Sequence, residues 1–239
     1  MTDHKNNSST SGHYLFSGVP EGYDGLLLAS KSQEASAEAV HLHVTRDAAR
    51  MAEIAATLSF FAPDLEVIML PAWDCLPYDR VSPKRDVLSQ RMDALTSLAS
   101  RKLDTSSPLL VLTTVNAILQ RVPAAHSLLK TTREYDIGSK VELEDLEKFL
   151  VQSGFDQVGT VREAGEFAIR GGIIDVFSPS NPLPVRMDLF GDEIEGLREF
   201  DPITQRTSEE VEKCVLKPSS EVFLNTESIA NFRSGYREA

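Results

Sequence analysis

The first half of the chain alternates short apolar runs with amphipathic helical patterns, and this alternation restricts the possible folds more than any other feature. Strands are expected at residues 26–29, 41–44, 67–70 and 109–115. The run at 109–112 is continuously apolar, which is typical of a strand buried on both faces. Strands that alternate with helices predict a parallel α/β sheet.

Two helices are the clearest elements between these strands. Thr45 is expected to cap the first, whose apolar positions recur at three- and four-residue spacing until Pro63 ends it. The order Ser82-Pro83 is typical of the start of the second.

From about residue 131 the pattern changes to one helix, at 143–153, followed by closely spaced strands and turns. This change marks a second domain of the α+β class. The first residues are rich in Ser, Asn and Thr and almost without apolar side chains, which is typical of disorder. We therefore expect a disordered tail at 1–13, a parallel-sheet α/β domain at 14–130 and an α+β domain at 131–217.

The net charge of −12 is concentrated in the predicted α+β domain. Residues 1–130 carry 12 Lys and Arg against 14 Asp and Glu, which gives −2. Residues 131–217 carry 10 against 19, which gives −9, and the remainder carries 2 against 3. Because Lys and Arg neutralise phosphate backbones, this acidic segment argues against independent DNA binding and favours a protein partner with a basic face.

Several classes of site are not expected. No apolar stretch approaches the roughly 18 to 20 residues that span a bilayer, and the N-terminus has no apolar signal core, so we expect a cytoplasmic protein. Cys75 and Cys214 stand far apart and indicate isolated buried thiols rather than a disulfide framework or a metal knuckle. His41 and His43 share a strand face but have no third ligand nearby, so no metal is expected there.

The most informative candidate for binding is the strand at 185–190. Alternate side chains of a strand share a face, so Arg186, Asp188 and Phe190 should lie opposite a core-facing set. The turn dipeptide Gly171-Gly172 should bring the strand that carries Arg170 alongside. Arginine and aromatic side chains dominate protein-binding hot spots, which indicates a docking surface.

A simpler interpretation of these residues stays open. Phe190 could fold back onto the core, and Arg186 could pair with Asp188 on a solvated face. Such exposed pairs contribute about 0 to 1 kcal/mol.

A search for catalytic chemistry gives two weak candidates. Residues 25–32 approach a phosphate-binding loop, but Ser30 replaces its second glycine and 26–29 are expected to be the strand itself, so nucleotide binding is not expected. The acidic residues near the turn at Gly191-Asp192 could hold a cation, although turn carboxylates usually serve the local backbone. They are Asp188, Asp192, Glu193 and Glu195.

The segment 71–83 follows a strand end and carries the only Trp of the chain. It fits either a ligand site, as at the strand ends of open α/β sheets, or a rigid loop that packs Trp73 and Tyr78 over the sheet edge.

Four segments of the chain, 71–83, 112–120, 170–177 and 186–195 with the following Phe200-Asp201, resemble the N-terminal region of the bacterial transcription-repair coupling factors (Mfd). This region of the family is homologous to the excision-repair protein UvrB, and the resemblance covers residues 14–239. It implies a first domain like that of UvrB without the ATP-binding motif, an inserted second domain at 131–217, and the start of a return segment of the first domain at 218–239. It also implies that the inserted domain recruits UvrA through Arg170, Arg186 and Phe190.

The resemblance predicts a non-catalytic module without a cofactor, which recruits UvrA to RNA polymerase stalled at DNA damage. RNA polymerase and DNA would be bound only by regions of the full-length protein that lie outside these residues. The inserted domain could also contact other domains of that protein and mask its own docking face. An alternative is a nucleotide- and DNA-binding repair fragment that acts like UvrB, which requires Lys31 to hold phosphate.

Overall fold

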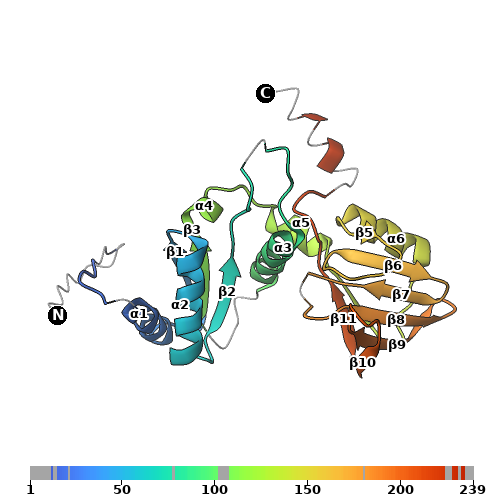
Figure 1. Ribbon diagram of the computed structural model, residues 1–239, viewed down its shortest axis with the longest axis horizontal. Helices are drawn as coiled ribbons and strands as arrows, with labels where there is room; N and C mark the ends of the chain where they lie inside the picture. Colours follow the sequence, from blue (N-terminus) through green and yellow to red (C-terminus); the bar gives the residue numbers. More distant parts are fainter. Residues whose placement is uncertain are drawn as a thin grey trace.

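The computed structural model describes residues 12, 15–20, 22–76, 79–101, 108–179, 181–223, 228–230 and 233–234. Two groups of elements make a mixed α/β architecture, one built on a three-stranded parallel sheet and the other on a six-stranded sheet (Figure 1). Apart from Gly12, the predicted tail at 1–13 lies outside the described residues.

The parallel sheet has the order β1 (Val40–Thr45), β3 (Leu109–Thr114), β2 (Glu66–Leu70). The strands predicted at 41–44, 67–70 and 109–115 are confirmed, and every residue of the central β3 is buried. β1 lies at one margin of this sheet, with Val40 and Leu42 exposed.

Helices α2 (Ala48–Phe61) and α3 (Arg85–Ser100) cover opposite faces of this sheet (Figure 1). The chain passes from β1 to β2 across β3 and then returns to β3, so two crossovers of the same hand place their helices on opposite sides. Leu110 and Leu112 of β3 pack with the apolar stripe of α2. Leu70 of β2 packs with the stripe of α3, which also contacts the short helix α5 (Ala125–Lys130).

Both predicted helix starts need correction by a few residues. The side chain of Asp47, rather than that of Thr45, caps α2 by accepting the backbone N–H of Arg50 at 2.9 Å. The Thr45 hydroxyl instead donates to carbonyl oxygens, one of them that of Thr113 in β3. α3 begins only after Lys84, because Ser82-Pro83 lies in the extended lead-in to the helix.

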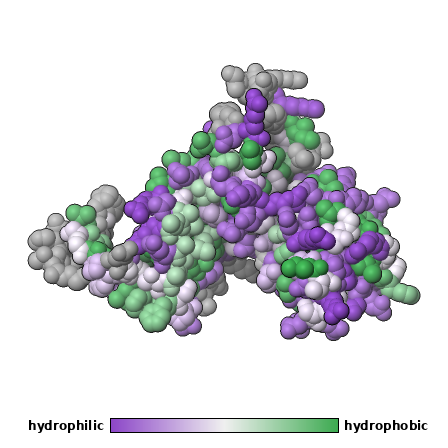
Figure 2. Space-filling view, in the orientation of Figure 1, coloured by the Kyte–Doolittle hydropathy of each residue, from purple (hydrophilic) through white to green (hydrophobic). Residues whose placement is uncertain are grey.

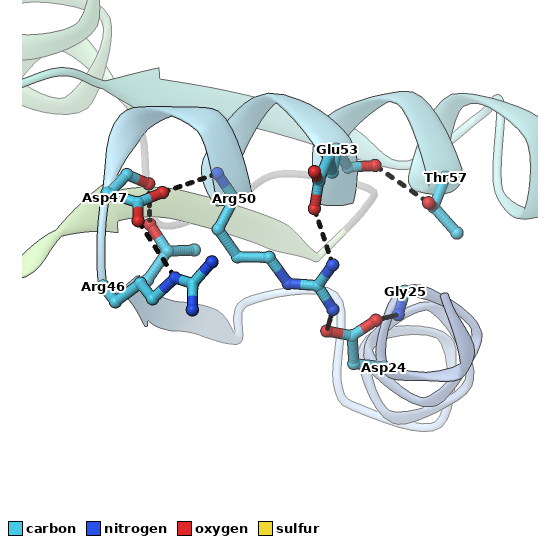
Figure 3. Close-up of polar contacts among 8 residues, drawn as sticks. Asp24, Gly25, Arg46, Asp47, Arg50, Glu53 and Thr57 are labelled. Atoms are coloured by element: carbon cyan, nitrogen blue, oxygen red, sulfur yellow. Dashed lines mark hydrogen bonds and ion pairs between the residues drawn. The ribbon is translucent and has the colours of Figure 1, made fainter. Parts of the chain in front are cut away.

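The strand predicted at 26–29 is wrong, since these residues belong to helix α1 (Tyr23–Gln33). A four-residue apolar run fits a strand and a buried helical turn equally well, and here the helix is stabilised by packing on α2. Gly25 lies at the contact: a Cβ there would approach Thr57 Cγ2 to 2.4 Å. Figure 3 shows Arg50 of α2 joined to Asp24 of α1 and to Glu53.

This correction changes the argument about the phosphate loop. Residues 25–32 form continuous helix rather than a strand and a loop, so they do not have the looped backbone that wraps a phosphate. Lys31 lies in the last turn of α1 and pairs with Glu34 at 2.9 Å, whereas a phosphate-binding lysine stands at a helix N-terminus.

The six-stranded sheet has the order β10-β9-β8-β7-β6-β5 and is antiparallel except for the β5–β6 pair. Its strands are β5 (Asp156–Gln157), β6 (Glu166–Arg170), β7 (Ile173–Val176), β8 (Val185–Phe190), β9 (Glu193–Phe200) and β10 (Thr207–Glu210). A separate antiparallel pair joins β4 (Arg133–Asp136) to β11 (Lys213–Leu216). The helix predicted at 143–153 is present as α6 (Leu143–Gln152).

α6 packs its apolar residues onto one face of the six-stranded sheet. Leu146, Phe149 and Leu150 share a buried cluster with alternate residues of the strands. Those strand residues are Phe167, Ile174, Val176, Val185, Met187, Ile194 and Leu197. Burying side chains of this size contributes roughly 1.5–3 kcal/mol each. The opposite face of the sheet carries the side chains in between, which are mostly polar.

A buried ion pair ties the end of the described chain back to the parallel sheet. Arg91 of α3 is fully buried and meets both carboxylate oxygens of Glu221, with Nε–Oε1 at 2.6 Å and Nη2–Oε2 at 3.0 Å. Its Nη1 donates to the carbonyl of Pro71 at 2.6 Å. Trp73 Nε1 donates to the same carboxylate at 2.7 Å. α3, the loop after β2 and residue 221 are therefore held together at one point.

No helix in the described part of the chain is long and apolar enough to cross a membrane. Both thiols were predicted to be buried; Cys214 is buried, but Cys75 is only half-buried, because it lies in the loop after β2.

Glu221→Ala should lower the free energy of unfolding by about 3–5 kcal/mol, because it leaves the buried Arg91 guanidinium without its carboxylate. Chemical denaturation followed by circular dichroism measures the change. Glu34→Ala, which removes an exposed partner of Lys31, serves as the control and should change stability by less than about 0.5 kcal/mol. Equal losses of stability in the two variants would contradict a stabilising role for the buried Arg91–Glu221 ion pair.

Burial raises the pKa of the Cys214 thiol from 9.0 to about 12. Since the thiolate is the reactive form, native Cys214 in a Cys75→Ser variant should react with a thiol reagent at pH 8 at least about a hundredfold more slowly than the unfolded chain. Above pH 9 the unfolded thiol ionises while the folded one stays protonated, so the folded state should lose stability between pH 9 and about 12. Rapid labelling of the native variant would show that Cys214 is not enclosed.

Candidate docking site

The predicted alternation along β8 is confirmed. Val185 and Met187 are buried against α6, while Arg186 and Asp188 are partly exposed on the other face. Phe190 ends the strand with 79% of its surface exposed, so it does not fold back onto the core. The expected turn follows at once, where Gly191 has the positive φ of +67° that favours glycine.

The predicted hairpin at Gly171-Gly172 places Arg170 at the same end of the sheet as Phe190. Gly172 accepts the backbone N–H of Leu189, the neighbour of Phe190, at 2.7 Å. A Cβ at Gly172 would lie 2.9 Å from the carbonyl oxygen of Leu189, so only glycine fits this approach without a shift. The hairpin tip therefore lies directly beside the end of β8.

Arg170 and Arg186 converge on one carboxylate, that of Asp175 in β7. Asp175 is paired directly opposite Arg186 in the sheet register, and its side chain is fully buried. Arg186 donates from Nε to Oδ1 at 2.6 Å and from Nη2 to Oδ2 at 3.0 Å, while Arg170 donates from Nη2 to Oδ2. We call these three residues the Asp175 triad.

The two arginines of the triad differ in exposure. The side chain of Arg170 is 48% exposed, and that of Arg186 is 17% exposed. Arg186 Cζ lies 4.7 Å from the ring centroid of the buried Phe200, which stacks against the guanidinium. The hydrogen bonds to Asp175 raise the pKa of Arg186. Arg186 is therefore a fixed cation, whereas Arg170 reaches solvent.

The simpler pairing of Arg186 with Asp188 is not what the structure shows. Asp188 pairs instead with Arg198 of β9, on the same face of the sheet. Each of the three arginines of this face, Arg170, Arg186 and Arg198, is therefore paired with an aspartate, either Asp175 or Asp188. Figure 2 shows hydrophilic and hydrophobic residues interspersed over the six-stranded sheet.

Sequence patterns identified the two arginines and Phe190 but missed Asp175, Phe200 and Arg198. One signal was present for Asp175, because an acid inside the apolar run Ile173-Ile174-Asp175-Val176-Phe177 indicates a carboxylate that needs a buried partner. Phe200 gave no signal, since its contact with Arg186 depends on the pairing of β8 with β9.

The other candidates are accounted for by local contacts. Asp192 lies 3.4 Å from Lys140, and within the described ranges no group of three or more His, Cys, Asp or Glu side chains could hold a metal ion. Burial lowers the pKa of His43, which disfavours its charged form. Trp73 is engaged by Glu221, as a rigid loop requires, and Tyr78 lies outside the described residues.

The second half of the chain matches a known protein family. Residues 134–222 match the family described as the UvrB interaction domain. They span β5–β10 together with β11 and all but the first residue of β4, and they include all three predicted docking residues.

Transcription-repair-coupling factors match most of the chain. That of Haemophilus influenzae is 30% identical over 227 residues, which cover 95% of this chain and 19% of the relative. That of Escherichia coli K12 is 37% identical over 176 residues, covering 73% and 15%. That of Myxococcus xanthus is 36% identical over 192 residues, covering 77% and 16%.

The chain therefore carries a UvrB interaction domain. Its homologues over most of its length are the transcription-repair-coupling factors (Mfd), which confirms the resemblance seen in the sequence. The chain spans less than a fifth of the length of these relatives.

Proposed function

We propose that this chain is a non-catalytic module of transcription-coupled repair whose six-stranded sheet docks UvrA. The face that carries Arg170, Arg186 and Phe190 is the docking surface. Recruitment of UvrA by this surface would bring excision repair to RNA polymerase stalled at DNA damage. The match to the UvrB interaction domain and the coupling-factor homologues support this role.

The observation that carries the proposal is that an exposed aromatic ring and an exposed, anchored arginine lie at the same end of one sheet. Phe190 is 79% exposed, and Arg170 lies at the adjoining hairpin with 48% of its side chain exposed. Aromatic and arginine side chains on one exposed surface are typical of an interface hot spot. The ring fills an apolar pocket of the partner, and the guanidinium binds a carboxylate or a carbonyl oxygen.

We further propose a domain organisation for the module. Residues 14–130 form a domain like the first domain of UvrB, residues 131–217 are inserted into it, and 218–239 begin its return. The Arg91–Glu221 ion pair supports the return, because it places residue 221 against α3 of the first domain. The module works in the cytoplasm, and contacts with RNA polymerase and DNA belong to other parts of a longer protein. Other domains of that protein are further partners of the docking face.

Arg170→Ala and Phe190→Ala should each weaken UvrA binding by about 2 kcal/mol, or roughly 30-fold in Kd, because each removes a hot-spot contact. Isothermal titration of UvrA into the purified chain measures the affinity. Circular dichroism should show that each variant keeps the fold.

Two variants serve as matched controls. Phe60→Ala removes an aromatic side chain that is 80% exposed on α2, and Arg46→Ala removes an exposed arginine that pairs with Asp47. Both lie on the parallel-sheet part of the chain and should leave the affinity unchanged. Wild-type affinity in the Arg170→Ala/Phe190→Ala double variant would refute the docking proposal.

A further inference from the structure

We infer that Arg186 and Asp175 are positioning residues of the docking surface, which act on UvrA through Arg170 rather than by touching it. This inference rests on the proposed function and divides its three residues into two classes. Arg170 and Phe190 contact the partner. Arg186 and the previously unassigned Asp175 hold the guanidinium of Arg170 where a partner carboxylate can reach it.

The hydrogen bonds of Arg186 are directed inward. Its Nε and Nη2 donate to the two oxygens of Asp175, at 2.6 and 3.0 Å. Its guanidinium also stacks on the buried ring of Phe200, and only 17% of the side chain is exposed. An arginine in this two-point geometry is oriented rigidly and cannot swing out to a partner without breaking both bonds.

Arg170 is bound less tightly within the same triad and is more exposed than Arg186. It reaches Asp175 through Nη2 alone, at the oxygen that Arg186 also uses, and 48% of its side chain remains exposed. A guanidinium has five N–H donors, so a single anchor leaves donors that can bind a second carboxylate. The anchor limits the motion of a long side chain, and this reduces the entropy that binding would otherwise cost.

The charges explain why both supporting residues are needed. Asp175 is fully buried, and a buried carboxylate requires close compensation. Without Arg186, both oxygens of Asp175 would draw in the guanidinium of Arg170 and take it from the docking face. Without Asp175, two guanidinium groups would repel each other and Arg170 would lose its anchor. Loss of either residue weakens binding although neither touches the partner.

A double-mutant cycle tests the inference. Arg186→Ala should weaken UvrA binding about tenfold in the wild-type chain, but less than about twofold when Arg170→Ala is already present, because its effect passes through Arg170. In a Phe190→Ala background the tenfold effect should persist. Asp175→Asn should show the same dependence on background. If Arg186→Ala only disturbed the sheet, it would weaken UvrA binding by the same factor in both backgrounds.

Two further variants keep the experiment decisive. Arg133→Ala is the matched control, since Arg133 also pairs with an aspartate, Asp145, and stacks on a phenylalanine, Phe149, but on the α6 side of the sheet. It should leave the affinity unchanged. If Arg186→Ala does not fold, Arg186→Lys keeps the charge but loses the two-point geometry, and it should give the same background dependence at smaller magnitude.

The outcomes separate this inference from the proposed function. If the Arg170→Ala/Phe190→Ala double variant binds UvrA like the wild type, the proposed function fails. If Arg170→Ala alone leaves the affinity unchanged while Phe190→Ala lowers it, the positioning inference fails and the docking function stands. If Arg170→Ala weakens binding and Arg186→Ala adds its full loss on top, Arg186 touches the partner directly. That additive result overturns the positioning role and leaves the docking function intact.

Discussion

The packing of α6 on one face of the six-stranded sheet is the constraint that organises the second half of the chain, because the opposite face carries only a smaller buried cluster around Val161, Ala168 and Phe200. α6 buries the alternate residues that face it, and strand geometry then places the intervening residues on the opposite side. Arg186 cannot leave that side without a slip in register that would bury charge and expose Val185 and Met187. The hydrophobic core on one face therefore determines which side chains the other face can present.

On the face opposite α6, the buried carboxylate of Asp175 fixes the positions of two arginine side chains. Asp175 gathers two arginines that are 16 positions apart in the chain, and Phe200 supports one of them from β9. The surface therefore has a fixed inner pair, Asp175 and Arg186, and two exposed groups, the guanidinium of Arg170 and the ring of Phe190. In the proposed docking role, such preorganisation would favour specific binding, because little side-chain freedom would be lost on contact.

Much of this fold could be predicted from the sequence, and the exceptions have physical reasons. The strands around 41–44 and 67–70 and the helix at 143–153 were found because their apolar patterns extend over enough residues to fix a period. Residues 26–29 were assigned to a strand because a run of four apolar residues fits the periodicity of a strand and of a helix equally well. Their packing on α2 determines that they are helical. The arginines and Phe190 could be found by strand parity and resemblance, whereas the sharing of Asp175 depends on strand pairing that no linear pattern contains.

The position of Glu221 has a mechanical consequence. The chain enters the part that contains the six-stranded sheet and the β4–β11 pair near residue 133, and leaves it after β11. The buried ion pair between Glu221 and Arg91 holds the outgoing segment to α3 a few residues after β11 ends. Lys217 adds a second fastening to Asp93 at 2.7 Å. Both contacts lie on the segment that leaves β11, so this segment is held against α3 at two points, and this restricts rotation of the second half of the chain about it. In the proposed complex, a partner bound at the hairpin of Arg170 would therefore be held at a fixed angle to the parallel sheet.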